Sequence, residues 1–337
     1  MRKLASIQKI ENLIPIEGAD RIIIATVLGW SMVTQKSNNF QIGDKVVHFE
    51  TDSFLPIYEK LEFLRPGSYR VMADGSEGFR IRTIRLRGQI SQGLILPIKE
   101  FPELVNLEVG TDLTDILKVK KWEPPVPACL DGVVISGFPG FLFKTDETRI
   151  QSYPKVLERH KGKKFYYTEK LDGSSCTIFN NEGDFGVCGR EWRLAETEEN
   201  TLWKVTNKYN LKEKLPRDIS IQGEIIGEGI QGNKYKMKGQ DIRIFNAFDI
   251  KKGCFVDTVE FIYICNALGI TPVPCLGEFV LDHTIEELVK LATRESDLIE
   301  DWAEGIVVRP FKEEIDPELG RLSFKVINPE FLLKWGD

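Results

Sequence analysis

The stretch KFYYTEKLDGSSCTIF, residues 164–179, decides the fold of the longer part of this chain. A run rich in aromatic and β-branched residues ends at Lys170, the pair Asp172-Gly173 is typical of a turn, and a second such run follows. The pattern predicts two strands joined at a tight turn, with the Lys170 amine at a strand end and facing a pocket. Taken alone, KxDG is a weak motif, because an Asp-Gly turn beside a solvated lysine also explains it.

Four segments further along the chain strengthen the functional interpretation, because they place charged or aromatic side chains within apolar runs. A charge inside an apolar strand is unfavourable unless it is paired or functional. Each residue also has a simpler explanation: a solvent-facing strand side for a glutamate, core packing for a phenylalanine, and protection of a sheet edge for a lysine. The segments and their central residues are SIQGEIIGEG (220–229) with Glu224, RIFNAFDI (243–250) with Phe248, AEGIVVRP (303–310) with Glu304, and SFKVINPEFLL (323–333) with Lys325.

Patterns of hydrophobic residues divide the chain into two domains. Residues 1–122 contain short Val-, Ile- and Thr-rich runs between Gly-, Asn- and Pro-bearing loops, which predicts a small β-barrel with one helix near 53–64. Prolines and glycines gather at 123–140, where we expect the junction. The runs in the first domain are 21–28, 45–50, 79–86 and 93–98.

Residues 141–337 alternate helical and strand patterns, which predicts an α+β domain with largely antiparallel sheets. The helical patterns cover 146–160, 196–214, 257–268 and 284–293, and the strand patterns cover 164–170, 175–179, 219–226, 242–249, 304–309 and 322–327.

Composition excludes some classes of protein. The chain has 337 residues and no apolar run approaching the roughly 18 residues of a membrane helix, so we expect no membrane association. Six cysteines without a CxxC pair and three histidines argue against zinc and fit a reducing intracellular compartment: cytosol, nucleus or organelle matrix. The net charge of −6 is weak evidence about nucleic acid, because affinity depends on local basic surface. We expect a monomer.

The ordered set of motifs resembles that of the covalent nucleotidyltransferases, which comprise DNA ligases, RNA ligases and mRNA capping enzymes. The resemblance covers roughly 141–328, and the order of the motifs makes it specific. In family terms KLDG resembles motif I, GREWR (189–193) motif Ia, QGEIIGE motif III, FNAFDI motif IIIa, EGIVVR motif IV and SFKVIN motif V.

Two further stretches narrow the resemblance to RNA ligases. FLFKTDETRIQ (141–151) is similar to a segment of the RNA ligases that seal nicks in duplexes, and QIGDKVVHFETDSFLP (41–56) is similar to the N-terminal OB-type domain of one RNA-ligase family, the Deinococcus and Naegleria type. The resemblance therefore implies an OB-type, RNA-binding β-domain followed by an ATP-grasp-like adenylyltransferase domain. It implies an ATP-dependent enzyme that joins 3′-hydroxyl and 5′-phosphate ends, expected to act at nicks.

Family membership implies three nucleotidyl transfers. Lys170 attacks the α-phosphorus of ATP, the AMP moves to a 5′-phosphate, and a 3′-hydroxyl then displaces it. Lys325 would hold the α-phosphate throughout, and Asp172, Glu224 and Glu304 would bind Mg²⁺ or Mn²⁺. A lysine must be neutral to attack, and deprotonation at pH 7 costs about 4.6 kcal/mol at the reference pKa.

The resemblance also implies roles around the nucleotide. The positive charges expected to ease deprotonation of Lys170 are Lys325, Arg149 and the metal. Residues expected at the nucleoside are Phe248 and Val307 sandwiching adenine, Glu169 reading its edge, and Arg190 and Glu224 at the ribose or phosphate. The sequence departs from the family at Ile327, where some relatives have a second lysine; Lys234, Lys236 and Lys238 are candidates for its replacement.

Four arginines of FRIRTIRLRG suit contacts with RNA phosphates, if the run is one strand. Arg80 and Arg82 would share one face, as would Arg85 and Arg87, although a solvated basic face is an equal alternative. Three other functions share the motifs: an mRNA guanylyltransferase or a DNA ligase, which both usually carry the OB domain after the catalytic domain, and a nucleic-acid-binding module with a degenerate fold.

Overall fold

The computed structural model describes residues 3–72, 74–122 and 134–336, and these fall into two compact units. The first contains the N-terminal segment up to Pro125, and it also takes in Ile150–Pro154 and Pro329–Asp337. The second contains Val126–Arg149 and Lys155–Asn328. Much of the predicted junction, 123–133 within 123–140, lies outside the described residues, as does Cys129. No helix in the described part of the chain has the length and apolar character needed to cross a membrane.

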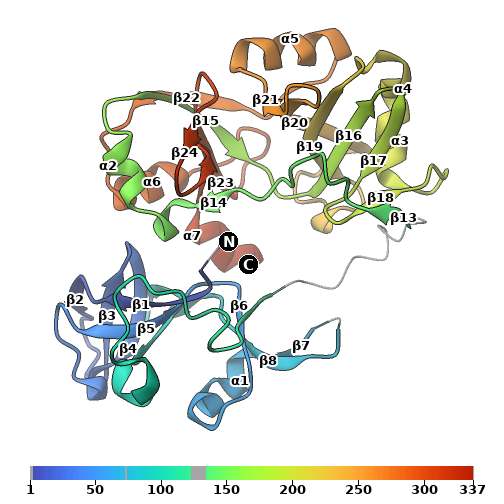
Figure 1. Cartoon of the computed structure of the whole chain (residues 1–337). Coiled ribbons are helices and arrows are strands. Elements are labelled where there is room, and N and C mark those ends of the chain that lie inside the picture. The colour runs from blue at the N-terminus through green and yellow to red at the C-terminus, as the bar shows by residue number, and fades with distance from the viewer. Residues whose placement is uncertain (1–2, 73, 123–133, 337) are drawn as a thin grey trace. The chain divides into compact units, whose positions relative to one another are not determined.

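The first unit is built from short antiparallel strands (Figure 1). One sheet has the order β1-β5-β11, another β2-β3-β4, a third β12-β6-β8-β7, and β9 pairs with β10. The strands are β1 (Ala5–Lys9), β2 (Asn12–Pro15), β3 (Ile22–Val27), β4 (Trp30–Gln35), β5 (Lys45–Phe49), β6 (Ser53–Leu55), β7 (Tyr69–Val71), β8 (Glu77–Arg80), β9 (Thr83–Leu86), β10 (Gln89–Gln92), β11 (Leu94–Pro97) and β12 (Lys120–Lys121). Helix α1 (Arg65–Ser68) and helix α7 (Pro329–Trp335) belong to this unit.

Two predicted elements of the first unit are wrong in detail. The run 79–86 is two strands in different sheets, because the chain leaves β8 at Arg80 and β9 begins only at Thr83. The predicted helix near 53–64 begins as β6, and only Glu59–Leu64 is helical, as a 3₁₀ helix. Pro56 separates the two, since it lacks the N–H that a longer helix or strand would need.

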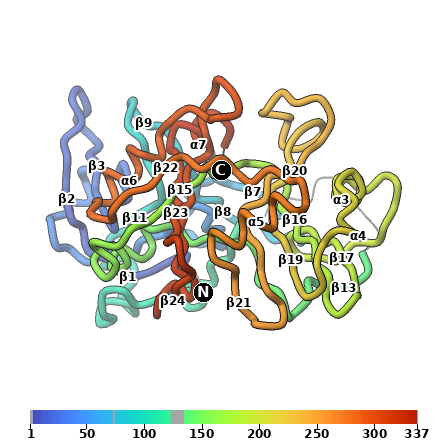
Figure 2. Tube along the Cα trace, turned by 90° about the horizontal axis from the view of Figure 1, so that it is seen from above, coloured from blue at the N-terminus to red at the C-terminus, as the bar shows by residue number. Residues whose placement is uncertain are grey.

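The second unit contains two large sheets that are antiparallel except for one strand pair, which confirms the predicted α+β class. The first sheet has the order β13-β18-β17-β16-β19-β20-β21, and the second has the order β14-β26-β23-β15-β22, in which β14 runs parallel to β26. Strand β15 therefore lies between β23 and β22 (Figure 2). The first sheet comprises β13 (Val134–Gly137), β16 (Ser174–Asn181), β17 (Asp184–Cys188), β18 (Trp192–Leu194), β19 (Ile219–Gly227), β20 (Gln240–Asp249) and β21 (Cys254–Phe255); the second comprises β14 (Thr148–Arg149), β15 (Lys164–Lys170), β22 (Cys275–Val280), β23 (Gly305–Pro310) and β26 (Phe324–Ile327).

The helices of the second unit are α2 (Lys155–Arg159), α3 (Thr201–Lys208), α4 (Leu211–Lys214), α5 (Thr258–Leu268) and α6 (Ile285–Ala292), and a hairpin joins β24 (Ile315–Asp316) to β25 (Gly320–Arg321). The predictions for 257–268 and 284–293 are confirmed. The predicted helix at 146–160 is confirmed only over α2, because Pro154 interrupts it and its first part forms β14. The pattern at 196–214 becomes two helices, since Asn200 caps α3 and Asn210 between them has a positive φ of 53°.

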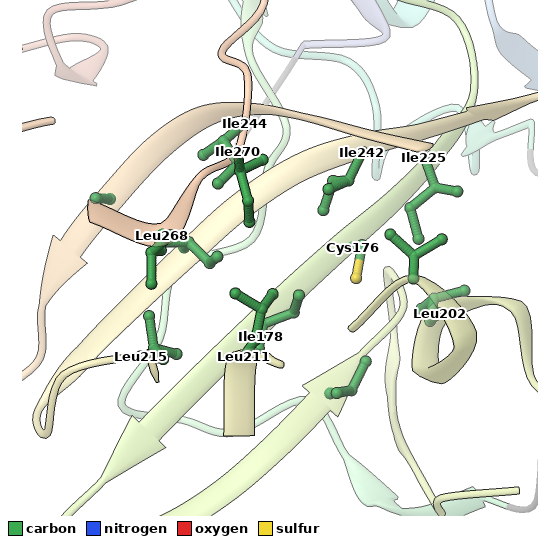
Figure 3. Close-up of a cluster of buried hydrophobic side chains, with 14 of the residues drawn as sticks. Cys176, Ile178, Leu202, Leu211, Leu215, Ile225, Ile242, Ile244, Leu268 and Ile270 are labelled. Carbon is green, nitrogen blue, oxygen red and sulfur yellow. The ribbon is translucent and has the colours of Figure 1, made fainter. Parts of the chain in front are cut away.

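The largest core of the second unit covers one face of the seven-stranded sheet (Figure 3). Cys176 and Ile178 of β16 and Ile225 and Ile242 of β19 and β20 are fully buried there. Helices α3 and α4 and the end of α5 supply the opposing side chains, among them Leu202, Leu211 and Leu268. This close packing holds β19 and β20 rigidly, and with them the side chains that these two strands contribute to the candidate site.

Candidate active site

Lys170 is the last residue of β15, as the turn motif predicts. The register aligns Lys170 with Gly305 of β23, and Thr168 with Val307. Val307 in turn lies opposite Lys325 of β26, and Lys325 beside Arg149 of β14. Residues opposite one another in a sheet share a face. The sheet therefore brings Val307, Lys325 and Arg149 into one row, adjacent to the row of Lys170.

The Lys170 amine is paired with a buried carboxylate. Its Nζ donates hydrogen bonds to both carboxylate oxygens of Glu304, at 2.6 Å each, and the two side chains are only 24% and 15% exposed. Burial alone would lower the pKa of Lys170, but the carboxylates of Glu304 and Glu224 outweigh it and raise that pKa above its usual value. Lys170 is thus an ammonium in this state, and it would have to lose a proton before it could act as a nucleophile.

Glu224 approaches the turn from the other sheet. It lies on β19, and one of its carboxylate oxygens accepts the N–H of Gly173 at 3.0 Å. A Cβ on Gly173 would lie 2.3 Å from the carbonyl oxygen of Ile225, so no larger residue fits at this close approach. Burial, and then repulsion from Glu304 and Asp172, raises the pKa of Glu224 to about 8 although Lys170 acts to lower it.

Asp172 is held by two neighbours from the loop that follows β19. Its backbone N–H donates to the Tyr235 hydroxyl at 2.9 Å, and its carboxylate pairs with the Lys234 ammonium. Of the three candidate lysines, Lys234 is therefore beside the turn, while Lys236 and Lys238 are exposed.

The departure from the family pattern, Ile327, lies in the same row of the sheet as Lys170. Ile327 is 4% exposed and lies opposite Gly305, which is itself opposite Lys170. This position thus presents an apolar side chain in the row of Lys170.

A cavity of about 60 Å³ opens beside Lys170 between the two sheets. Its walls include Thr168, Glu169 and Val307 of the five-stranded sheet, and Glu224 and Phe245 of the seven-stranded sheet. The complete lining is Thr145, Glu147, Thr168, Glu169, Lys170, Leu171, Glu224, Phe245, Val273, Val307 and Arg309.

The aromatic residue of this cavity is Phe245, so the assignment of that role to Phe248 needs correction. Phe248 is 2% exposed and packs against Phe143 and Phe255, with ring centroids 5.4 Å and 5.1 Å away. Phe245 and Phe248 lie three residues apart on β20, but the register of β20 against β19 shifts between Ile244 and Asn246, so Phe245 lies in a β-bulge. Simple alternation of strand faces does not hold across a bulge, and the pattern of FNAFDI alone does not say which phenylalanine meets Val307.

Of the remaining predicted nucleotide-binding residues, Glu169 borders the cavity and Arg190 does not. Glu169 is 1% exposed, and its carboxylate accepts hydrogen bonds from the Ser296 hydroxyl at 2.5 Å and the Asp297 N–H at 2.8 Å. Burial raises the pKa of Glu169 despite these bonds. Arg190 is outside the cavity lining and pairs with Asp146 at 3.0 Å on the exposed surface.

The predicted metal ligands are distributed around the turn. Among the described residues, no group of three or more His, Cys, Asp or Glu side chains is gathered as a ready metal site. Asp172 and Glu304 are instead neutralised by Lys234 and Lys170. The donor chemistry nevertheless fits a hard divalent cation, because Asp172, Glu224 and Glu304 repel one another electrostatically and supply oxygen ligands.

Neither arginine pair of the first unit shares a strand face. Arg80 ends β8 with its guanidinium 5.1 Å from the Trp122 ring centre, and Arg82 lies between strands and is exposed. Arg85, on β9, pairs with Glu330 of α7 at 2.9 Å. Arg87 is exposed in the following turn, at a φ of 48°.

Comparison with known proteins assigns both units. Residues 4–98 match the model of an OB-fold domain, and residues 163–327 match the model of the RNA ligase family. None of the curated proteins compared matches the chain.

Solved structures extend the similarity to nearly the whole chain. The Naegleria gruberi RNA ligase with PPi is 39% identical, with 98% of each chain covered and a TM-score of 0.88. A lysine-to-alanine mutant of that ligase with ATP and Mn is 38% identical over 98% of each chain, with a TM-score of 0.90. A lysine-to-methionine mutant of the same ligase with AMP and Mn is 38% identical over 98% of each chain, with a TM-score of 0.88. Because the fold, the order of motifs and the identity agree over both units, the chain belongs to the RNA ligase family, alongside the Naegleria ligase.

Proposed function

We propose that this RNA ligase uses ATP to join 3′-hydroxyl and 5′-phosphate ends at nicks in duplexes, through AMP attached to Lys170. The observation that carries the proposal is the position of Lys170: its amine ends a strand, contacts a buried carboxylate and borders a cavity between two sheets. The Naegleria ligase structures with ATP and Mn, with AMP and Mn, and with PPi support the nucleotide chemistry by similarity.

In the first step the neutral Lys170 amine attacks the α-phosphorus of ATP. A phosphoramidate bond forms between Nζ and phosphorus, the bond from that phosphorus to the bridging oxygen of the β-phosphate breaks, pyrophosphate leaves with the electron pair, and Nζ loses a proton to solvent. Glu304 accepts both hydrogen bonds of the resting ammonium and is therefore placed to orient the amine. The rigid end of β15 keeps this orientation before the nucleotide binds.

In the second step a terminal 5′-phosphate oxygen attacks the AMP phosphorus, the bond from that phosphorus to Nζ breaks, and Lys170 takes up a proton from solvent as it departs as an amine. In the third step the 3′-hydroxyl oxygen attacks the activated 5′-phosphorus, AMP leaves, and the hydroxyl proton is lost to solvent. Lys325, in the row beside Lys170, would keep its positive charge near the reacting phosphate in each step.

Asp172, Glu224 and Glu304 are the residues that would hold a Mg²⁺ or Mn²⁺ ion, directly or through its waters. Such an ion supplies positive charge to the triphosphate oxygens. The ammonium groups of Lys170 and Lys234 now pair with two of these carboxylates, so they compete with a cation for the same negative charge.

For the base, we propose Phe245 and Val307 as the two faces of the adenine site. They lie on different sheets and line the same cavity. Glu169 borders that cavity with a carboxylate fixed by two donors, which suits reading of the adenine edge. Arg149 is in the row of Lys325 and suits phosphate binding, whereas Arg190 reaches ribose or phosphate only by leaving Asp146.

The function is tested by incubating the protein with α-labelled ATP or GTP and a divalent metal. We expect covalent label from ATP, with the AMP adduct on the peptide that contains Lys170, as measured by mass spectrometry. Preference for GTP would indicate a guanylyltransferase, and absence of label would indicate a binding module. Nicked duplexes with RNA or DNA on each side then separate the ligase classes, since equal sealing of an all-DNA nick contradicts the proposed RNA specificity.

We further propose that the exposed arginines of the first unit bind RNA phosphates. Replacement of Arg82 and Arg87 by alanine should weaken binding of nicked RNA duplex and reduce the log–log salt slope by about 1.8 units, as expected for two lost phosphate contacts. Self-labelling by ATP should be unchanged. The matched control removes Lys212 and Lys214 of α4, with the same change in net charge. An unchanged salt slope in the arginine variant, or an equal change in the control, contradicts this assignment.

A further inference from the structure

The proposed base site depends on the separation of two sheets. Phe245 lies on β20 of the seven-stranded sheet, and Val307 lies on β23 of the five-stranded sheet. A planar base fits between them only if that separation is maintained. Packing leaves part of the Phe245 side open, because a second, apolar cavity of about 530 Å³ also borders Phe245, Val273 and Thr168.

Arg309 connects these two sheets directly. It lies two residues after Val307 on β23, is 3% exposed, and borders both cavities. Its guanidinium donates to the carbonyl oxygen of Phe245 at 2.7 Å and to the Ser323 hydroxyl at 2.9 Å. A third bond reaches the Glu147 carboxylate at 2.6 Å. One planar group thus holds the backbone of the aromatic residue from the strand that carries Val307.

Glu147 supplies the charge that allows Arg309 to be buried. Burial raises the pKa of the Glu147 carboxyl, but Arg309 and Arg321 more than offset it and keep the pKa below its usual value. An unpaired buried guanidinium is strongly unfavourable, so the pair is expected to act as a unit. Glu147 also borders the smaller cavity, which places the whole pair in its wall.

The same geometry argues against a phosphate-binding role for Arg309. The register places Lys170 opposite Gly305 but Tyr166 opposite Arg309, four residues along β23. At the usual rise per residue this is about 13 Å from the level of the nucleophile. Its donors are also directed at three acceptors of the protein. Arg309 therefore acts on the walls of the cavity rather than on the triphosphate.

We propose that Arg309, neutralised by Glu147, is a positioning residue that fixes the gap between Phe245 and Val307 and thereby sets affinity and selectivity for the adenine base. This inference rests on the proposed function, because it assumes that the cavity beside Lys170 receives the base of ATP.

The test is the substitution Arg309→Lys, which keeps the positive charge for Glu147 but cannot bond to three separate acceptors. We expect the ATP concentration that half-saturates self-labelling to rise about tenfold, the equivalent of one lost charge-assisted hydrogen bond, with the maximal rate nearly unchanged. Calorimetric binding of AMP should weaken by the same factor, and the preference for ATP over GTP should fall. If Arg309 only stabilised the fold, Arg309→Lys would lower the unfolding temperature. It would not raise the half-saturating ATP concentration while leaving the maximal rate nearly unchanged.

Arg321→Lys is the matched control. Arg321 also donates to β20, through the Asn246 side chain at 2.8 Å, and pairs with Glu313, but it is outside the lining of the nucleotide cavity. Its variant should show normal half-saturation by ATP. Glu147→Gln is a second variant of the pair and should move the half-saturating ATP concentration in the same direction as Arg309→Lys.

The outcomes separate this inference from the proposed function. If the unmodified protein takes up no label from ATP, the proposed function fails. If it is labelled but Arg309→Lys leaves both half-saturation and AMP binding unchanged, or Arg321→Lys shifts them equally, the positioning role of Arg309 is overturned while the ligase function stands.

Discussion

Replacement of Lys170 by alanine should abolish covalent labelling by ATP and reduce ATP-dependent sealing on the order of 10⁴-fold or more, because the proposed mechanism has no other group that forms the bond to AMP. Lys170→Arg should fail equally. It keeps a positive charge beside Glu304 but supplies no nucleophile at accessible pH, so the comparison separates nucleophilic attack from electrostatics.

The same variant should retain part of the third step. An RNA whose 5′-end already carries AMP needs no attack by Lys170, so Lys170→Ala should still seal a nick prepared with such a strand in the absence of ATP. The measurement is gel analysis of joined product from both substrates. Lys164→Ala is the control, since Lys164 starts the same strand and pairs with Glu278 on the surface. Persistent labelling of Lys170→Ala would remove this lysine from the mechanism.

Glu304→Gln tests two opposed roles of the Glu304 carboxylate. Faster or slower self-labelling by the variant decides between them. If Glu304 only stabilised the Lys170 ammonium, its neutralisation would lower the cost of deprotonation and speed self-labelling. If Glu304 also helps hold the divalent cation, the substitution weakens cation binding and so removes positive charge that stabilises the phosphates. We expect the second effect to win, with labelling slowed roughly 100- to 1,000-fold, the scale of one lost electrostatic contact to a transition state.

The measurement is the single-turnover labelling rate over a range of Mg²⁺ or Mn²⁺ concentrations. Partial recovery at high metal concentration should accompany the loss, because a weakened site still fills by mass action. Glu314→Gln is the control, since Glu314 pairs with Lys163 and is outside the lining of the cavity. Faster labelling by Glu304→Gln would instead make Glu304 an inhibitory partner of Lys170 and remove it from the metal set.

Local sequence predicted those parts of the fold in which neighbouring residues decide the structure. The strand, the Asp-Gly turn and the following strand around Lys170 were predictable because β-rich runs and a turn pair act over a few residues. Helices α5 and α6 were predictable for the same reason; Thr284 even forms a capping box with Glu287. Predictions failed where a break lay inside a run, as at Pro154 and between Arg80 and Thr83.

The sequence by itself determined the order of the motifs and the combination of an OB-type domain with a ligase domain, and it predicted Lys170 as the nucleophile, since these depend on residue type and spacing. Only the tertiary structure decided that Phe245 rather than Phe248 borders the cavity, that Lys234 reaches Asp172, and that Arg309 joins the two sheets. The physical reason is that these relations connect residues 60 or more positions apart, or depend on a register shift within a strand. Strand register and sheet packing set both, and neither is encoded by a local pattern.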